Sequence, residues 1–550
     1  MQRIIQPVTK NNYIYPSFIH FTKKNNMTLR FLLLLTTLFS LNLLKAQDME
    51  VQWGLQTKDG GSSTSYIPLG WNAGHYYVVQ IDGNDGYLLN IDSKMNLESQ
   101  TELITGSKKF EADIIFMRDN KIHLLYSDYE SGEKTTYVRA TTFSLKGKAE
   151  GTKLKKVAGI TVEKSTQKND VKYFYSSDSS KLLIVEELDM KKTDDAQISL
   201  TVVNTTTFET DWSTMSTIPY ESGYFFPLSY AVEKNGNVMM LATIKGSEGK
   251  NMERYSTHMF SFAGKTEKFQ QKELALDGKF ISSAAIRFVD NEKILITGFY
   301  NDLTTKGKDE GIEGSFLAIA DPVDLGSLDL HVKPMDIFTK TSIVRTGNLS
   351  QFFDADELNA YSMREINVNP DGSGYVIAEQ RFMVQNDNGN LMTRTYYFNH
   401  LILYRFDENQ EITWISTIPK VQVSSISTPI IGIGPISFWF FTGGMIRSAY
   451  KYNSFLSMEK DGNIYVLYND HKDNGDAKTL KEVKPMTNKN KALATVAIVG
   501  QDGKWEKTQL FRGKDLDVIL ETSSSFPINN IGFTISAEKG KSLQYGKLDL

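Results

Sequence analysis

Apolar and polar residues alternate along residues 361–419, and this pattern predicts four antiparallel strands in a row. Asp371-Gly372 and Asn388-Gly389 lie in two of the intervening turns, where Asp and Asn bond the local backbone and Gly allows a positive φ. The expected strands are Tyr361–Val368, Gly374–Val384, Thr393–Phe406 and Glu411–Ile418. Such a small sheet cannot bury both faces alone, so it must pack against others of its kind.

The same unit, a polar turn followed by an apolar strand, recurs along the chain. Its apolar strands are HYYVVQID (75–82), KIHLLYSD (121–128), KLLIVEEL (181–188), NVMMLATI (237–244), KILITGFY (293–300), GYVIAEQR (374–381) and NIYVLYND (463–470). From the second to the fifth unit, the turns are 55 to 59 residues apart, which is the size of a propeller blade. The chain is therefore predicted to be all-β, a β-propeller of four-stranded antiparallel blades.

An eighth, incomplete unit follows at the C-terminus, with predicted strands at 517–522, 531–538 and 542–550. Its fourth strand is missing, but EVQWGLQT (50–57) is similar to the expected fourth strands EITWISTI (411–418) and TDWSTMST (210–217). We expect this N-terminal strand to close the last blade, which removes exposed sheet edges. Eight blades are favoured, and seven are the alternative if the last segment belongs to the seventh blade.

Two insertions interrupt the spacing, at 334–360 and 420–447. The second contains the uncharged stretch IIGIGPISFWFFTGGMI (430–446), whose aromatic residues are Phe438, Trp439, Phe440 and Phe441. Its glycines, its proline and its short length argue against a membrane span. It is predicted either to fold over the propeller as a loop or to dock a partner as an exposed apolar patch.

The N-terminal region has the features of a secretory signal peptide. Arg30 supplies positive charge, Phe31–Leu44 is an apolar core of 14 residues, and Ala46 offers a small residue for cleavage. The 26 residues before Met27 carry Lys10, Lys23 and Lys24 and no acid. Either they form an unusually long n-region or translation starts at Met27, and the second alternative is favoured.

The chain is therefore predicted to have two parts: residues 1–46, an N-terminal extension with a signal peptide, and residues 47–550, a single propeller domain. The signal peptide predicts export to the periplasm or to the extracellular space or cell surface. No transmembrane span is expected after signal removal, because the apolar stretch 430–446 is short and is interrupted by glycines and Pro435.

Composition narrows the class of partner. The chain has no cysteine, so neither a disulfide-stapled fold nor a lipid anchor on an N-terminal Cys is open to it. Residues 47–550 carry 55 basic and 65 acidic residues, and this net negative charge repels phosphate backbones. A protein or glycan partner is therefore expected, and a nucleic acid is not.

Three short motifs resemble a known family. Tyr396-Tyr397-Phe398-Asn399-His400, Ile412-Thr413-Trp414-Ile415 and Ile418-Pro419 resemble segments of uncharacterised exported β-propeller-like proteins of bacteria. The resemblance extends over nearly all of residues 47–550, and its motifs are structural. It implies a propeller fold and export, and it brings no activity with it.

Motifs for catalysis or metal binding are missing from the sequence. It has no H-E-x-x-H, no pair of histidines at i and i+4, no G-x-S-x-G and no phosphate-binding loop. Two oxygen-rich loops, Asp82–Gly86 and Asp470–Asp476, lack the distal acid of a calcium loop. We therefore expect hairpin turns there and no cofactor, with calcium as the less favoured alternative.

One recurrence suggests a ligand site. The apolar strands end in Tyr-Ser-Asp or Tyr-Asn-Asp in three units, and glutamates lie in the equivalent register of two others. In a propeller these positions fall towards one rim, where they would bind sugars or cations, and two suitably spaced carboxylates would hydrolyse a glycoside. The candidate ligand-binding residues are Tyr126, Asp128, Glu187, Tyr300, Asp302, Glu379, Tyr468 and Asp470. The competing interpretation is that these residues only cap hairpins.

Three hypotheses about function follow. The first is an exported binding or scaffold propeller, and the missing catalytic motifs favour it. The second is a carbohydrate-active or other hydrolytic propeller that uses the rim carboxylates. The third is an envelope-assembly subunit that docks through residues 430–446. Fold analogy alone cannot choose among them, because propellers host many functions.

Overall fold

The computed structural model describes residues 49–58, 64–104, 112–150, 154–161, 171–246, 255–264, 268–289, 293–302, 312–322, 325–326, 328–335, 361–387, 391–429, 450–479, 482–512, 518–528, 530–540 and 542–550. Internal contacts divide the chain into Met1–Met49 and Glu50–Leu550, and the second unit holds every described strand. The predicted signal peptide lies outside the described residues.

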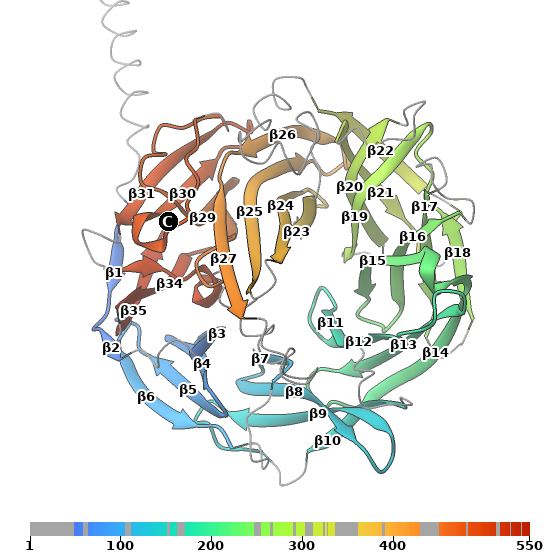
Figure 1. The fold of residues 1–550 in the computed structure, drawn as a ribbon, viewed down its shortest axis with the longest axis horizontal. Helices are drawn as coiled ribbons and strands as arrows, with labels where there is room; N and C mark the ends of the chain where they lie inside the picture. The colour runs from blue at the N-terminus through green and yellow to red at the C-terminus, as the bar shows by residue number, and fades with distance from the viewer. Residues whose placement is uncertain are drawn as a thin grey trace, which may run out of the picture. The chain divides into compact units, whose positions relative to one another are not determined.

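Eight antiparallel sheets form a ring, so the predicted all-β propeller with eight blades is confirmed (Figure 1). Blades 1 to 4 consist, from the centre of the ring outward, of β3 (Thr64–Asn72), β4 (His75–Asp82), β5 (Asp85–Ile91) and β6 (Leu97–Glu102); β7 (Ile114–Arg118), β8 (Lys121–Glu130), β9 (Thr135–Ser144) and β10 (Lys155–Thr161); β11 (Val171–Tyr175), β12 (Lys181–Glu187), β13 (Asp195–Asn204) and β14 (Thr210–Glu221); and β15 (Phe225–Val232), β16 (Val238–Lys245), β17 (Tyr255–Phe262) and β18 (Phe269–Glu273).

Blades 5 to 8 continue the ring. They consist of β19 (Lys279–Val289), β20 (Lys293–Asp302), β21 (Gly314–Ala320) and β22 (Leu328–Pro334); β23 (Tyr361–Val368), β24 (Gly374–Asp387), β25 (Leu391–Phe406) and β26 (Ile412–Ile418), with β27 (Gln422–Pro429) added to β25; β28 (Phe455–Lys460), β29 (Asn463–His471), β30 (Ala492–Val499) and β31 (Trp505–Arg512); and β32 (Ile519–Leu520) with β33 (Phe526–Ile528), β34 (Gly532–Lys539), β35 (Ser542–Asp549) and β1 (Val51–Trp53) with β2 (Thr57–Lys58). The helical turns described are η1 (Ser222–Tyr224), η3 (Lys489–Lys491) and η4 (Thr522–Ser524).

The N-terminal strand closes the last blade, as predicted. β1 pairs antiparallel with β35, with Val51 opposite Leu548 and Trp53 opposite Gly546. A Cβ on Gly546 would lie 2.6 Å from Val51 Cγ1 and 2.8 Å from the Trp53 ring, so only glycine leaves room for this strand. Trp53 also meets Phe511 of blade 7 edge-on, with ring centroids 5.1 Å apart. The closure therefore ties the first residues of the ring to its last two blades.

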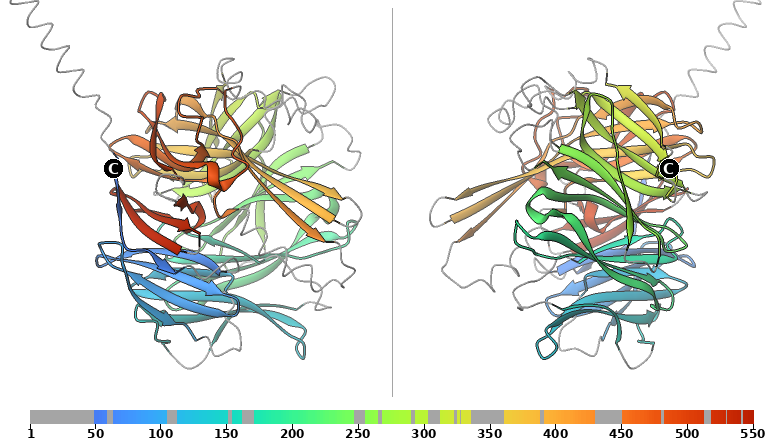
Figure 2. Two further views of the ribbon diagram at one scale, coloured as in Figure 1. Left: turned by 60° about the vertical axis from the view of Figure 1, so that its left-hand side comes forward. Right: turned by 90° about the vertical axis from the view of Figure 1, so that its right-hand side faces the viewer.

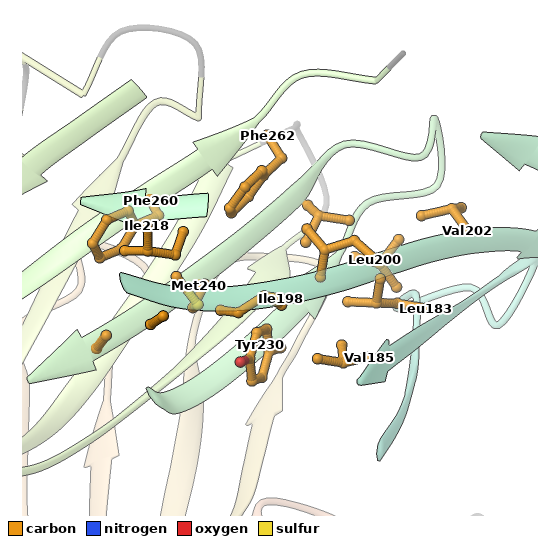
Figure 3. Close-up of a cluster of buried hydrophobic side chains, with 14 of the residues drawn as sticks. Leu183, Val185, Ile198, Leu200, Val202, Ile218, Tyr230, Met240, Phe260 and Phe262 are labelled. Atoms are coloured by element: carbon orange, nitrogen blue, oxygen red, sulfur yellow. The ribbon is translucent and has the colours of Figure 1, made fainter. Parts of the chain in front are cut away.

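The core lies between neighbouring blades. Each strand sends alternate side chains to its two faces. β12 gives Leu183 and Val185 to the interface with blade 4, where they belong to one cluster with Tyr230 and Phe260 (Figure 3). Burying one such apolar side chain contributes about 1.5–3 kcal/mol. Comparable clusters between other neighbouring blades hold the ring together in a chain that has no cysteine.

Tryptophans on the outer strands tie one blade to the next. Trp212 Nε1 of β14 donates to the carbonyl of Gly236 at 2.9 Å, and Trp414 Nε1 of β26 donates to the carbonyl of Gln501 at 2.8 Å. Each acceptor belongs to the following blade. The resemblance among the three Trp-bearing segments thus identified the fourth strands correctly.

Part of the second insertion is a strand rather than a loop. β27 pairs with the N-terminal half of β25, from Leu391 opposite Pro429 to Phe398 opposite Gln422. The C-terminal half of β24, the N-terminal half of β25 and β27 make a three-stranded ribbon, defined here as residues 381–387, 391–398 and 422–429. This ribbon projects beyond the blades (Figure 2). The serine-rich segment QVSSISTP hides this strand from a search for apolar alternation. Residues 336–360 and 430–449, with Phe438–Phe441, lie outside the described part.

Candidate functional site

The candidate tyrosines lie in the core. Tyr126, Tyr300 and Tyr468 are 5%, 2% and 0% exposed and pack in the clusters between blades. Burial raises the pKa of Tyr468, because a phenolate without water is costly. Their rings fill the spaces between blades, which leaves little surface for a ligand to touch.

Each candidate acid whose side chain is described lies beside a cation. The pairs are Asp128 Oδ2 with Arg139 Nε at 3.5 Å, Glu187 Oε1 with Lys172 Nζ at 2.6 Å, Glu379 Oε1 with Lys420 Nζ at 2.7 Å, and Asp470 Oδ2 with Lys507 Nζ at 3.1 Å. The four acids belong to four different blades, and among them only Glu379 and Asp470 share surroundings, around Lys420. Asp302 ends β20, and its side chain is outside the described part. Ligand binding at these positions stays a prediction.

Glu379 and Asp470 belong to one buried polar network where blades 6 and 7 meet. Lys420 Nζ donates to Glu379 and, at 3.0 Å, to the carbonyl of Phe398. Burial lowers the pKa of Lys420, and the charges of Glu379 and Asp470 partly oppose this shift. Burial and then the charge of Lys420 lower the pKa of His400 to about 3, so that imidazole stays neutral.

The same network fixes the base of the ribbon. Gln422, the first residue of β27, donates from Nε2 to the carbonyl of Asn469 in blade 7 at 2.7 Å. Its Oε1 accepts from the backbone N–H of Ser454 at 2.7 Å and from Lys420 at 3.1 Å. Val423 N–H and the carbonyl of Met486 add a 3.0 Å bond. The ribbon therefore leaves the ring in a defined direction.

Glu186 is another buried acid, and it lies next to the candidate Glu187 that the sequence singled out. Glu186 faces the interface of blades 2 and 3, is 2% exposed, and its Oε2 has no hydrogen-bond partner among the described residues. Burial raises its pKa to about 8. Nearby, Tyr173 donates to Asp113 Oδ2 at 2.8 Å. Glu187, the predicted residue, faces blade 4 instead and accepts from Tyr230 at 2.9 Å.

A cavity of about 740 Å³ opens on the inner strands of blades 5 to 8. It is lined by Arg287 of β19, Arg364 and Glu365 of β23, and Lys460 of β28, among others. Arg287 and Arg364 also line a second cavity of about 350 Å³, which reaches β11 and β15. Both volumes are in the range of sites that bind small ligands.

Sequence reasoning missed Arg287, Arg364 and Lys420. A weak signal existed for the two arginines, because each is a charged residue inside an otherwise alternating first strand, KFISSAAIRFV and YSMREINV. Lys420 had no such signal, since it follows Pro419 in what reads as the start of a loop.

The described residues contain neither a cluster of metal-ligating side chains nor a long apolar helix. No group of three or more His, Cys, Asp or Glu side chains is placed there to hold a metal ion. Asp82 and Asp85, in one of the two oxygen-rich loops, pair across the hairpin of β4 and β5. Within the same described ranges, no helix has the length and apolar character that a membrane span needs.

Comparisons with known proteins give distant similarity to solved structures. No family model matches the chain, and no curated protein matches it. Among solved structures, it is similar to the β-propeller domain of the Trilobed protease from Pyrococcus furiosus (11% identity, TM-score 0.31, 85% of this chain and 97% of that one). It is also similar to the WD40 domain of SCAP from fission yeast (8%, 0.32, 91% and 92%) and to an ulvan lyase, a polysaccharide lyase (8%, 0.37, 90% and 96%).

Proposed function

We propose that the protein is an exported binding propeller that holds a protein partner on the ribbon of blade 6. The observation that carries this proposal is the ribbon, whose three strands leave the ring (Figure 2). Exposed side chains lie on both of its faces, with Met383 on one and Ser425 on the other. Binding residues concentrate on extensions that a rigid scaffold holds in place. Residues 47–550 would act in the periplasm or outside the cell.

Both faces of the ribbon carry apolar or aromatic side chains among polar ones. One face carries Met383, which is 47% exposed, with Tyr396 opposite it. The other face carries Phe382 stacked on Tyr397, with ring centroids 4.5 Å apart. On that second face, Thr393 and Thr395 also exchange 3.0 Å hydroxyl bonds with Ser427 and Ser425 of β27. Aromatic and Met side chains set among polar groups suit a protein surface that binds another protein, where such side chains are enriched.

The edges of the ribbon offer a second mode of contact. Beyond Gln380, β24 pairs only with β25 among the described strands, and beyond Val423 the outer edge of β27 faces no described strand. Unpaired backbone groups on such edges accept an additional strand from a partner. The uncharged residues 430–446 follow β27 directly, so Phe438–Phe441 belong to the same proposed docking region.

A crosslinked pull-down tests this proposal. The tagged protein is captured from an envelope fraction and its partners are identified by mass spectrometry. A double variant, Met383→Ser with Tyr396→Ser, removes the methionine and the tyrosine from one face of the ribbon. Met215→Ser is the matched control, because Met215 is 49% exposed on β14, away from the ribbon. We expect one partner to be lost from the double variant alone; identical partners for all three proteins would contradict the proposal.

The hydrolytic alternative predicts a different result. If the acids of the second strands act on a glycoside, Asp128→Asn, Asp302→Asn and Asp470→Asn would abolish turnover of polysaccharide, peptide or ester substrates. Because Asp128 and Asp470 are each held by a cation, we expect no such turnover before or after the changes. A glycan bound without turnover would replace the protein partner in the proposal.

A further inference from the structure

An irregularity of β23 places Arg364 at the cavity of about 740 Å³, which is called the central cavity from here on. The register between β23 and β24 shifts between Met363 and Glu365, so Arg364 is the extra residue of a β-bulge. Bulges re-aim side chains and recur beside binding sites. The side chain of Arg364 is 37% exposed and lines both cavities.

Positive charge exceeds negative charge around Arg364. Glu379 is the shared acceptor, with Lys420 Nζ at 2.7 Å, Arg364 Nε at 3.7 Å and Arg381 Nε at 3.9 Å. Ser454 Oγ donates to its second oxygen at 2.8 Å. Burial and then the charge of Arg364 lower the pKa of Arg381, which shows that the two guanidinium groups repel each other.

Three acids also line the larger cavity: Glu365, Glu459 and Asp461. Glu459 Oε1 accepts from Arg405 Nη2 at 2.7 Å. Glu365 accepts from the hydroxyl of Ser457, and burial raises the pKa of Glu365 towards the neutral form. Two of the three carboxyl groups are therefore engaged within their own surroundings, and Asp461 lies exposed in the turn between β28 and β29.

Arg287 faces the same cavities from the neighbouring blade. Its Nη1 donates to the carbonyl of Ile366 on β23, which holds the guanidinium between blades 5 and 6. An arginine fork fixed in this way needs little reordering to meet a carboxylate, sulfate or phosphate group.

We propose that the central cavity binds an anionic ligand, with Arg364 and Arg287 contacting its carboxylate, sulfate or phosphate groups. The cavity of about 740 Å³ accommodates a ligand of several rings or residues. The chain as a whole has a net formal charge of −4, so a positive cavity is a local feature that selects anions against the general charge of the surface.

Isothermal titration calorimetry on the purified protein tests the site with three probes of different anionic group: an oligogalacturonate, a chondroitin sulfate oligosaccharide and inositol hexakisphosphate. We expect at least one probe to bind with a Kd below about 1 mM at low salt and more weakly at high salt. The probe that binds best identifies the anionic group. Arg364→Gln should weaken that binding by about tenfold or more, because the charge-assisted hydrogen bonds of the guanidinium group are lost.

Arg118→Gln is the matched control. Arg118 also belongs to an inner strand, β7, and has its own carboxylate, Asp119, at 3.6 Å; its change should leave probe binding as it is. If Arg364→Gln lowers the melting temperature, Arg364→Lys keeps the charge, loses the fork, and should still bind more weakly. Failure of all three probes, or equal binding by wild type and both Arg364 variants, would overturn the proposal. Met383→Ser should not change probe binding, so this site and the ribbon are tested separately.

Discussion

Lys420 Nζ lies 2.7 Å from Glu379 Oε1, and both side chains are fully buried where β27 begins. A buried pair of this kind adds little net stability, because desolvation offsets the attraction. Removing only one of the two partners lowers stability, however, since the other charge is left buried and uncompensated. The pair therefore matters here for position: it fixes the root of the ribbon to blade 6, while Gln422 joins that root to blade 7.

Lys420→Met should destabilise the protein by about 3–5 kcal/mol, the range for breaking a buried pair. The value falls to the lower end if Arg364 and Arg381 move in to compensate Glu379. Urea unfolding followed by tryptophan fluorescence measures the change. Lys504→Met is the control, because Lys504 pairs with Asp502 at 2.7 Å on the surface, where water and salt screen the attraction and the pair adds little stability. Equal midpoints for the two variants would show that the buried pair is not needed.

Gly546→Ala should open the closure of the ring. The added Cβ would lie 2.6 Å from Val51 Cγ1, so β1 must move or leave β35. Overpacking of this kind costs about 1–3 kcal/mol. Limited proteolysis should then remove the first residues of the N-terminal strand faster than in the wild type. Gly132→Ala has no atom within 4 Å of its new Cβ and should behave as wild type; equal cleavage of all three proteins would contradict the closure by β1.

Glu186 predicts a pH dependence of stability. Its pKa is raised from 4.5 to about 8, so the folded protein keeps a proton that the unfolded chain releases at lower pH. Stability should therefore fall as pH rises from about 4.5 to about 8, by at most about 1.4 kcal/mol per unit. Glu186→Gln should remove this slope, gaining stability at pH 8 and little at pH 4.5. Melting temperatures across this range test it, with exposed Glu98→Gln as control; the same slope in all three proteins would refute the effect.

The architecture was readable from the sequence because each blade repeats a local signal. The turn at Asp371-Gly372 and the Trp of EITWISTI recur in other units, so the strand order follows from the repeat, and the repeat favoured eight blades over seven. The closure was readable for the same reason, since the segment around Trp53 matches the fourth strands of other blades.

The site was only partly readable, because spacing says which strand a residue belongs to and not which neighbour it meets. Asp470 was singled out as a rim acid, yet Lys507, 37 residues later, buries it in an ion pair. Glu187 was chosen over Glu186 although adjacent residues of a strand face different blades. The meeting of Lys420 with Glu379 depends on an insertion strand whose composition carries no strand signal.

Photocrosslinking from the ribbon tests the central claim most directly. A photoreactive phenylalanine analogue replaces Met383 on β24 in one protein and Met215 on β14 in another; the two side chains are 47% and 49% exposed. Both proteins are irradiated in intact envelope fractions and the crosslinked bands are identified by mass spectrometry. If the ribbon holds the partner, position 383 gives a discrete crosslink to one protein and position 215 gives none. The same products from both positions, or crosslinks from position 215 alone, would contradict the claim.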